Sequence, residues 1–327
     1  MKLATYRDGS RDGQLVVVSR DLTLAHYANG IAGRLQQVLD DWNFLSPQLE
    51  ELSQALNHGK ARHAFEFDPR LCMAPLPRAY QWLDGSAYTN HIELLRRARG
   101  AEPPPGWQTR PLIYQGGSDD FIGACDPIVC RSTDDGIDFE AEVAVITGDV
   151  PMGATPEAAL EAVRLLMLVN DVSLRELTGP EVASGFGLVQ SKPATAFAPV
   201  AVTPDEIGTA WRDGRVHLAV EIRWNGRRVG LCPTGPEMTF HFGDLIAHVC
   251  QTRNVRAGSI VGAGTVSNRD AAHGYACIAE KRAMETLEGR HEHTAYLQYG
   301  DTVRIEMQGT DGTSVFGAIE QRVARPA

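Results

Sequence analysis

The stretch IDFEAEVAVI, residues 137–146, decides how the rest of the chain is interpreted. Successive side chains of a β-strand point to opposite faces, which places Glu140 and Glu142 on one face and Phe139 and Val143 on the other. Two carboxylates roughly 7 Å apart on a half-buried face repel each other, and a divalent cation relieves that repulsion because hard cations prefer carboxylate oxygens. Taken alone, the pair fits better with a commoner arrangement, the solvated outer face of an edge strand.

The composition indicates an ordinary globular protein with room for a large core. The chain has 327 residues, of which 43% are hydrophobic and 22% charged. That length suits one large domain, or a small domain followed by a larger one. A net charge of −10 repels nucleic acid and anionic membranes, so neither is expected as a partner.

The cysteines and the N-terminus indicate a reducing compartment. The cysteines are Cys72, Cys125, Cys130, Cys232, Cys250 and Cys277. They form no CxxC pair and no Cys/His zinc spacing, which is typical of buried reduced thiols. The N-terminal segment MKLATYRDGSRDG lacks the apolar region of a signal peptide, and no apolar run approaches the length of a membrane span. We therefore expect a cytoplasmic protein.

Residues 1–75 predict a small leading domain. Apolar runs favour strands over residues 2–6, 14–19, 22–27 and 63–67, and apolar spacing of three and four residues predicts helices over 35–44 and 46–56. A segment with two prolines, residues 74–82, is the expected linker into the main body.

Residues 76–327 mix many strands with few helices. Helices are predicted over 154–171, where Thr155 can cap and Pro156 can occupy the first turn, and over 237–252. The expected strands are a hairpin with its turn at Asn225-Gly226, a buried strand within 256–268, and further strands over 275–289 and 301–323. The pattern predicts a β-rich α+β fold rather than alternating βαβ units.

Four acids stand out as candidate metal ligands, and they are Asp84, Glu140, Glu142 and Asp171. Four carboxylates suit Mg²⁺ or Ca²⁺, and the lack of a histidine or cysteine ligand makes zinc a poorer fit. Asp171 has an equally good alternative role as the cap of a helix that begins at VSLREL.

His91, seven residues after Asp84, is a candidate general base. A helix beginning near Ser86 or Tyr88 would place His91 on the same face as Tyr88 and Leu95. The alternative is a histidine that packs in the core or caps a helix.

Five motifs together carry a resemblance to a known family. They are DGSAYTNH at 84–91, FEAEVAV at 139–145, NDVSLRE at 170–176, QSKPATAF at 190–197 and GAGTVSN at 262–268. In this order and spacing, over about residues 70–320, the chain resembles the fumarylacetoacetate hydrolase family. The resemblance implies a mixed β-roll around a divalent metal, preceded by a small SH3-like N-terminal domain. Residues 1–75 would form that leading domain and 76–327 the catalytic domain.

The resemblance also implies roles for individual residues. Asp84, Glu140, Glu142 and Asp171 match the metal ligands, His91 the residue that activates water, Glu280 its orienting partner, Arg175 and Lys192 the oxyanion-stabilising positions, and Tyr114, Arg99 and Thr265 the substrate contacts. Placing Glu280 and Arg99 requires a one-residue shift each.

Two positions depart from the family pattern. A glutamine that completes the oxyanion site falls on Thr178, and Gln190 is the suggested substitute. A substrate-binding tyrosine falls on Ser86, and Tyr88 is the suggested source of its hydroxyl. These departures concern the choice of substrate more than the reaction.

Three of the implied catalytic residues also have ordinary alternatives. Arg175 can form a helical ion pair with Glu176 or Glu181, and Lys192 can be a surface lysine in a loop. Glu280, expected in a strand, can pair with a neighbouring cation on a solvated face.

The resemblance predicts a hydrolase that uses Mg²⁺ or Ca²⁺, with Mn²⁺ as an alternative, to cleave a C–C bond in a fumarylacetoacetate-like or acylpyruvate diketo acid. The expected setting is aromatic catabolism, such as tyrosine degradation, and the expected assembly is a homodimer. One rival is a hydratase, isomerase or decarboxylase of 2-oxo acids on the same fold. A second rival is a metal-binding protein without catalysis.

Overall fold

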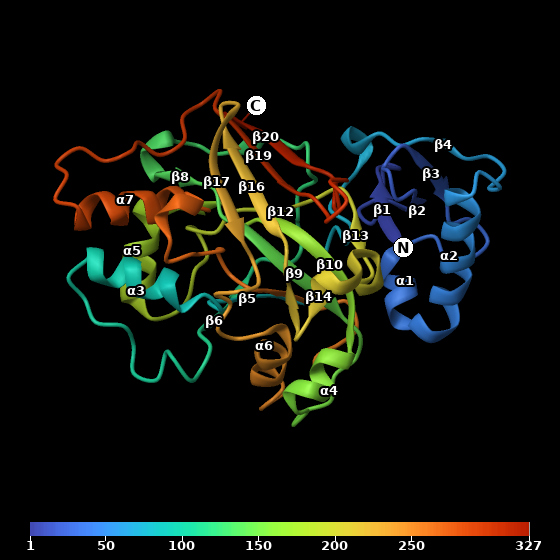
Figure 1. Ribbon diagram of the computed structural model, residues 1–327, viewed down its shortest axis with the longest axis horizontal. Coiled ribbons are helices and arrows are strands. Elements are labelled where there is room, and N and C mark those ends of the chain that lie inside the picture. The colour runs from blue at the N-terminus through green and yellow to red at the C-terminus, as the bar shows by residue number, and fades with distance from the viewer. Residues whose placement is uncertain (327) are drawn as a thin grey trace.

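The structure is a computed structural model that describes residues 1–326 (Figure 1). A mixed 11-stranded sheet runs through it in the order β4-β3-β2-β1-β13-β10-β9-β18-β5-β6, with β12 beside β10. These strands are β1 (Lys2–Tyr6), β2 (Gln14–Val18), β3 (Leu24–Tyr27), β4 (Phe65–Glu66), β5 (Trp82–Gly85), β6 (Ile113–Gly116), β9 (Ala141–Thr147), β10 (Val163–Asn170), β12 (Ala196–Phe197), β13 (Ala201–Val202) and β18 (Ile260–Gly262).

A second sheet, of five strands, packs against the first in the order β17-β16-β19-β20-β7. Its strands are β7 (Ile128–Val129), β16 (Ala219–Trp224), β17 (Arg227–Pro233), β19 (Thr302–Met307) and β20 (Ile319–Ala324). Two further sheets have two strands each: β8 (Ile137–Asp138) pairs with β11 (Ser173–Leu174), and β14 (Trp211–Arg212) pairs with β15 (Arg215–Val216). Val145 of β9 and Leu168 of β10 share one apolar core with Ile222 of β16 and Ile305 of β19. The main core therefore lies between the two sheets.

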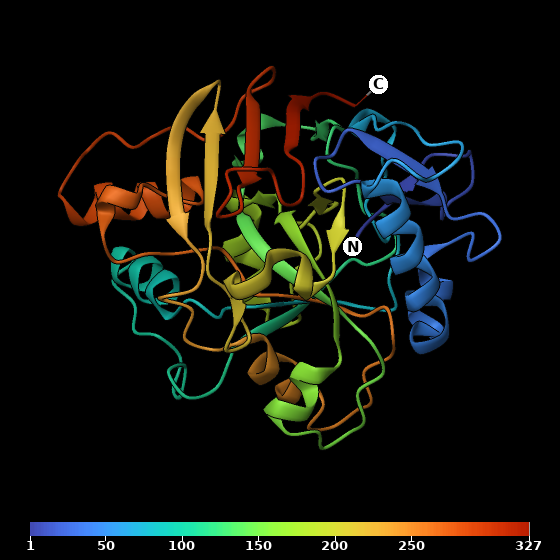
Figure 2. The ribbon, with the colours of Figure 1, turned by 45° about the vertical axis from the view of Figure 1, so that its right-hand side comes forward.

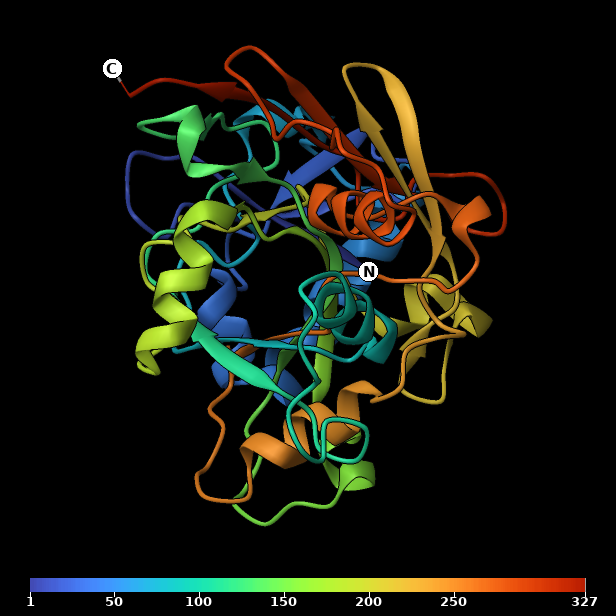
Figure 3. The same cartoon turned by 90° about the vertical axis from the view of Figure 1, so that its left-hand side faces the viewer.

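The helices lie around the sheets in separate groups. They are α1 (Leu35–Asp40), α2 (Trp42–Asn57), α3 (Thr89–Ala98), α4 (Pro156–Glu161), α5 (Arg175–Ser184), α6 (Phe242–Val249) and α7 (Ile278–Leu287), with 3₁₀ turns at Pro69–Leu71, Thr133–Asp135, Pro204–Ala210 and Ala271–His273. Helices α3, α5 and α7 gather on one side of the molecule, which faces the viewer in Figure 3. Helices α1 and α2 lie on the opposite side, beside β1–β3 (Figure 2).

The leading segment joins the main body through the large sheet. Strand β1 pairs with β2 on one side and with β13 on the other, where Lys2 lies opposite Val202. Apolar residues of this segment, including Leu3 and Val17, share a second core with Leu165 of β10. The division of the chain near residue 75 stays a prediction, although the hydrogen-bonded sheet crosses it.

The predicted helix over 154–171 is wrong in its second half. Helix α4 ends at Glu161, and Val163–Asn170 form the central strand β10 between β9 and β13. The segment VRLLMLVN is apolar on both faces because sheet neighbours and core cover both sides of it. A continuous apolar run does not distinguish a buried strand from a buried helix, which explains the error.

The strand predicted over 275–289 is also wrong, because this segment forms α7. Its residues Ala279, Lys281, Met284 and Leu287 belong to the strong helix formers, and the Cys277 side chain caps the helix. Glu280 is therefore a first-turn residue of a helix rather than a strand residue.

Other expectations are confirmed. The hairpin β16–β17 turns at Asn225 and Gly226, whose φ angles of 50° and 75° fit the tight turn expected from this pair. Helix α6 lies within the predicted 237–252, and β18 is the buried strand predicted within 256–268. The β-rich α+β fold class is confirmed.

Across residues 1–326, none of the helices combines the length and apolar character that crossing a membrane requires.

Gly262 on β18 links the fold to the acidic residues. A Cβ at this position would collide with Oδ1 of Asp84 and with the ring of Trp82 on the adjacent strand. Gly262→Ala should therefore destabilise the protein by about 1–3 kcal/mol, as overpacking of a core does. Urea denaturation measures the change.

The matched control is Gly179→Ala in α5, where an added Cβ meets nothing within 4 Å. Alanine is the better helix former, so this variant should be neutral or more stable. Equal stability of Gly262→Ala and wild type would show that β18 and β5 are not held as closely as described.

Candidate functional site

Three of the predicted metal ligands meet where the central strands run side by side. Strand β18 pairs with β5 and β9, and β9 pairs with β10. This arrangement brings Asp84 of β5, Glu142 of β9 and Asp171, the residue after β10, together. Oxygens of the three carboxylates lie within 4.8 Å of one another, and all three residues are buried. We call Asp84, Glu142 and Asp171 the acidic cluster.

The acidic cluster is electrostatically unsatisfied within residues 1–326. Both carboxylate oxygens of Glu142 are buried there without a hydrogen-bond partner, and Glu142 is 0% exposed. Burial and then the charges of Asp84 and Asp171 raise the pKa of Glu142 well above its ordinary value. Burial and the charge of Asp171 likewise raise the pKa of Asp84. Buried like charges with free hard oxygens are what a divalent cation stabilises, so the residues fit such an ion.

Glu140, the fourth predicted ligand, is paired with two positively charged side chains. Its Oε1 accepts a hydrogen bond from Nη2 of Arg175 at 2.6 Å, and its Oε2 accepts one from Nζ of Lys192 at 2.6 Å. Burial raises the pKa of Glu140, but Lys192 and Arg175 outweigh it and hold this pKa well below its ordinary value. Glu140 is thus ionised, and it adjoins the acidic cluster because Lys192 Nζ also donates to Asp171 Oδ2 at 2.6 Å.

Asp171 is held by side chains from three segments. Besides Lys192, Tyr114 of β6 donates its hydroxyl proton to Oδ2, and Thr195 donates to Oδ1 at 2.8 Å. The alternative role as a helix cap is wrong, since Leu174 occupies the N-cap of α5. The alternative of a solvated face for the glutamates is also wrong, because both are buried.

The charged side chains of Arg175 and Lys192 are largely shielded from solvent. The Arg175 side chain is 10% exposed and that of Lys192 8% exposed. Arg175 pairs with Asp138 and Glu140 rather than with an acid of its own helix, and it begins α5. The ordinary alternatives for both residues are therefore wrong.

His91 and Glu280 form a hydrogen-bonded pair. Nδ1 of His91, on α3, lies 2.8 Å from Oε1 of Glu280, on α7, although the two are 189 residues apart in sequence. Glu280 is buried and the His91 side chain is 15% exposed, so the imidazole is open to solvent on one side. The start of α7, which carries Glu280, is bound by Asp138, and Asp138 also binds Arg175, which pairs with Glu140. This chain of contacts connects the pair to the acidic residues.

Asp138 belongs to the site and was not predicted from the sequence. Its Oδ1 accepts the backbone N–H of Ile278 at 2.7 Å, and its Oδ2 accepts that of Ala279 at 2.9 Å and Nε of Arg175 at 2.8 Å. One fully buried carboxylate thus fixes both Arg175 and the start of α7. The available signal was its position in IDFEAEV, two residues before Glu140 on the alternating pattern.

Only some of the predicted substrate-binding residues contact the other site residues. Tyr114 touches the site, with Lys192 Nζ 5.3 Å from its ring centroid. Tyr88 is buried and donates its hydroxyl proton to the carbonyl of Thr234, so that hydroxyl is engaged away from the site. Thr265 is buried just after β18.

The remaining predicted positions lie at the surface or are already engaged. Arg99 is exposed at the end of α3. Gln190 is exposed, and its backbone N–H donates to Glu181 at 2.7 Å. The Thr178 hydroxyl donates to the carbonyl of Leu174 at 3.1 Å within α5. Neither Thr178 nor Gln190 is hydrogen-bonded to the acidic residues, so the choice between them as the oxyanion donor stays open.

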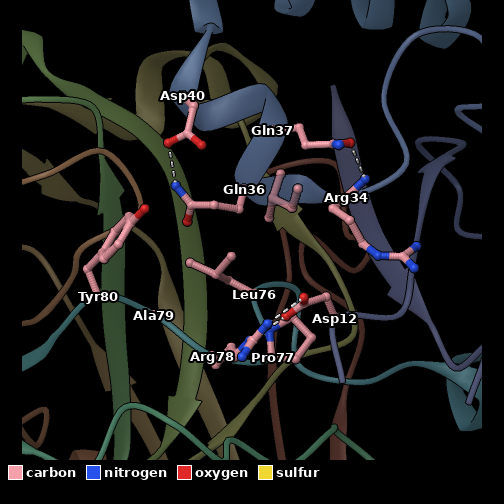
Figure 4. A pocket seen from close by; sticks show the side chains of 11 residues that line it. Asp12, Arg34, Gln36, Gln37, Asp40, Leu76, Pro77, Arg78, Ala79 and Tyr80 are labelled. Atoms are coloured by element: carbon pink, nitrogen blue, oxygen red, sulfur yellow. Dashed lines mark hydrogen bonds and ion pairs between the residues drawn. The ribbon is translucent and has the colours of Figure 1, made fainter. Parts of the chain in front are cut away.

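A cavity of about 420 Å³ lies elsewhere, between α1 and residues 76–80 (Figure 4). Its polar side chains pair among themselves, as Arg78 does with Asp12 and Gln36 with Asp40. None of the predicted site residues lines it. The predicted site residues therefore lie apart from this cavity.

Comparisons with known proteins identify the family of this chain. Residues 81–324 match the family model described as fumarylacetoacetate (FAA) hydrolase C-terminal, and residues 1–78 match fumarylacetoacetase N-terminal domain 2. The chain is similar to 2,4-didehydro-3-deoxy-L-rhamnonate hydrolase of Sphingomonas sp. (strain SKA58), with 27% identity over 215 residues. This match covers 63% of the chain and 65% of that relative, so it spans less than two thirds of the relative's length.

Solved structures share the fold along the whole chain. Fumarylacetoacetate hydrolase of Exiguobacterium antarcticum superposes with a TM-score of 0.68 at 20% identity, and all of both chains is covered. Maleylpyruvate hydrolase of Sphingobium sp. SYK-6, solved with manganese(II) and pyruvate, gives 0.65 at 15% identity with the same coverage. The C-terminal match alone includes most of the residues, and the chain therefore belongs to the fumarylacetoacetate hydrolase family.

Proposed function

We propose that this protein is a divalent-metal-dependent hydrolase that cleaves a C–C bond in an acylpyruvate or a fumarylacetoacetate-like diketo acid. The observation that carries the proposal is the His91–Glu280 pair beside the buried acidic cluster. A base that can take a proton from water, next to a site for a cation, is what hydrolysis of such a substrate requires.

Asp84, Glu142 and Asp171 would hold the cation, with Glu140 adjacent through Lys192. All of these donors are hard carboxylate oxygens, which suits Mg²⁺, Ca²⁺ or Mn²⁺. When bound, the cation supplies a Lewis acid that polarises the substrate carbonyl and stabilises the charge of the departing enolate.

His91 acts as the general base. Glu280 accepts the Nδ1 proton of His91, which fixes the tautomer and leaves Nε2 free to take a proton from water. The water then attacks the carbonyl carbon next to the bond that breaks. Glu280 does not touch the water, so its contribution is the orientation of the imidazole.

Arg175 and Lys192 supply fixed positive charge to the site. Burial lowers the pKa of both side chains, but their carboxylate partners outweigh burial and raise each pKa above its ordinary value. Both groups therefore stay protonated at neutral pH, and they can stabilise the oxyanion that forms when water adds to the carbonyl.

The rival reactions make less use of these groups. A hydratase, isomerase or decarboxylase of 2-oxo acids does not need a base that activates water for attack on a carbonyl. A metal-binding protein without catalysis needs neither the His91–Glu280 pair nor the buried Arg175. The proposal also retains a cytoplasmic homodimer that acts in aromatic catabolism, with the six free thiols supporting a reducing compartment.

Glu142→Gln should stabilise the metal-free protein but weaken its binding of the cation. The substitution removes an unpaired buried charge, so the metal-free variant should be more stable than wild type at neutral pH. With the raised pKa of Glu142, wild-type stability falls as pH increases above the ordinary carboxyl value of 4.5. The difference in stability between Glu142→Gln and wild type should therefore grow as the pH increases over the same range. Thermal denaturation in the presence of a chelator measures this difference.

Calorimetric titration with Mg²⁺ or Mn²⁺ provides the second half of that test. Glu142→Gln and Asp171→Asn should both bind the cation more weakly, because each loses a charged oxygen ligand. Glu221→Gln, on the surface of β16, is the matched control. Wild-type affinity in both cluster variants would remove these residues from the metal site.

Asp138→Asn should slow turnover and leave metal affinity unchanged. The amide NH₂ cannot accept the hydrogen bonds from Ala279 and Arg175, so Arg175 and the first turn of α7 shift. We expect kcat to fall about 10–100-fold, as for other residues that orient a site. The acidic limb of the pH–rate profile should also move, because Glu280 no longer aligns His91. Asp270→Asn, at an exposed 3₁₀ cap, is the control. A normal kcat and an unchanged pH–rate profile in Asp138→Asn would contradict the role of Asp138 in positioning Arg175 and α7.

The reaction itself is tested with a panel of diketo acids in ¹⁸O-labelled water. Wild type with Mg²⁺ should release pyruvate or another 2-oxo or 3-oxo acid, with label in the new carboxylate. His91→Ala should lose about a hundredfold to ten-thousandfold in rate, and Glu280→Gln should be slowed with little change in metal affinity. Hydration of a 2-oxo-4-enoate or decarboxylation of oxaloacetate, with all diketo acids intact, would establish a rival reaction.

A further inference from the structure

A second group of metal-ligating side chains lies around the proposed base. Ligand atoms of Cys277, His91 and Glu280 lie within 4.8 Å of one another. Cys277 is buried at the N-cap of α7, where its Sγ accepts the backbone N–H of Glu280 at 3.4 Å. The proposed reaction makes no use of this thiol.

The donor set differs in kind from the acidic cluster. A thiolate, an imidazole and one carboxylate form a softer set that suits Zn²⁺ rather than Mg²⁺ or Ca²⁺. Sequence alone favoured no zinc site because His91 and Cys277 are remote in the chain and show no regular spacing. The packing of α3 against α7 brings them together.

The geometry requires only local adjustment. Zinc bonds of about 2.0–2.3 Å in a tetrahedron place ligand atoms about 3.3–3.8 Å apart. The ligand atoms here lie within 4.8 Å of one another, and Nδ1 of His91 lies 2.8 Å from Oε1 of Glu280. Side-chain shifts of roughly 1 Å or less therefore bring the three groups to the spacing that zinc requires. Three protein ligands leave the fourth position for water, as in open zinc sites. His91 is partly exposed, which gives an ion a route to the cluster.

We propose that Cys277, His91 and Glu280 form a second, inhibitory site for a thiophilic divalent cation, with Zn²⁺ as the expected ion. On binding, the Cys277 thiol releases its proton to solvent, and the thiolate and the Glu280 carboxylate balance the two charges of the ion. The ion occupies a ring nitrogen of His91 and fixes Glu280, so His91 can no longer accept a proton from the attacking water.

The surrounding charges allow the ion to bind. The positive charge of Arg175 acts on the Cys277 thiol, and Arg175 is already paired with Asp138 and Glu140. The two acids thus offset the repulsion that Arg175 would otherwise exert on an incoming ion.

Binding is tested with Co²⁺ as a coloured substitute for Zn²⁺, on protein whose acidic cluster is saturated with Mg²⁺. Wild type should develop the near-ultraviolet charge-transfer band of a cobalt–thiolate bond, and added Zn²⁺ should remove it. Cys277→Ser should lack the band. Serine is a good N-cap, so α7 is retained in this variant, as circular dichroism and thermal denaturation check.

The control is Cys250→Ser, another buried thiol, at the end of α6, and it should keep the band. Absence of the band in wild type, or its persistence in Cys277→Ser, would overturn the proposal. This readout does not depend on the reaction, so it remains decisive even if the proposed hydrolase activity fails.

Inhibition is tested separately, with each variant compared with its own rate before zinc is added. Cys277→Ser should need about 10–100-fold more Zn²⁺ than wild type for half inhibition, the usual cost of weakening a metal site. Cys250→Ser should behave like wild type. Equal zinc sensitivity of Cys277→Ser and wild type would place the inhibitory ion in the acidic cluster and overturn the inhibitory role of the thiol site.

Discussion

Repulsion among buried carboxylates is the constraint on which the rest of the site depends. Asp84, Glu142 and Asp171 are enclosed by the central strands, where water does not screen their charges. The fold supplies Lys192 and Arg175 close by, but both bind Glu140, and only Lys192 reaches Asp171. The carboxylate of Glu142 is left without a partner within residues 1–326. A bound cation would relieve this repulsion.

The two glutamates of the central motif consequently have different environments although they are only two residues apart. Glu140 just precedes β9 and faces the two cations, whereas Glu142 lies within β9 and faces other acids. Their pKa values move in opposite directions for this reason. One short segment thus provides a carboxylate that is paired with Arg175 and Lys192 and a second carboxylate that is free to bind a metal.

Much of this site follows from the sequence, and the parts that do not have physical reasons. Alternation along residues 137–146 predicted that Glu140 and Glu142 share a face, and both are buried in the structure. Motif resemblance predicted the contact between His91 and Glu280, which are hydrogen-bonded. The error at β10 arose because a strand covered on both faces has no alternation to detect. The partners of Asp138 and Cys277 depend on how α5 and α7 pack, which no local pattern encodes.

The pairing of β1 with β13 makes the first residues of the chain a structural part of the large sheet. Without them, β13 and the adjacent end of β10 would present unpaired N–H and C=O groups at a new sheet edge, and the apolar residues beneath α1 and α2 would face water. Such an edge is a template for pairing between molecules. The leading segment therefore protects the catalytic region from aggregation, and an isolated catalytic region would be a poor choice for expression or crystallisation.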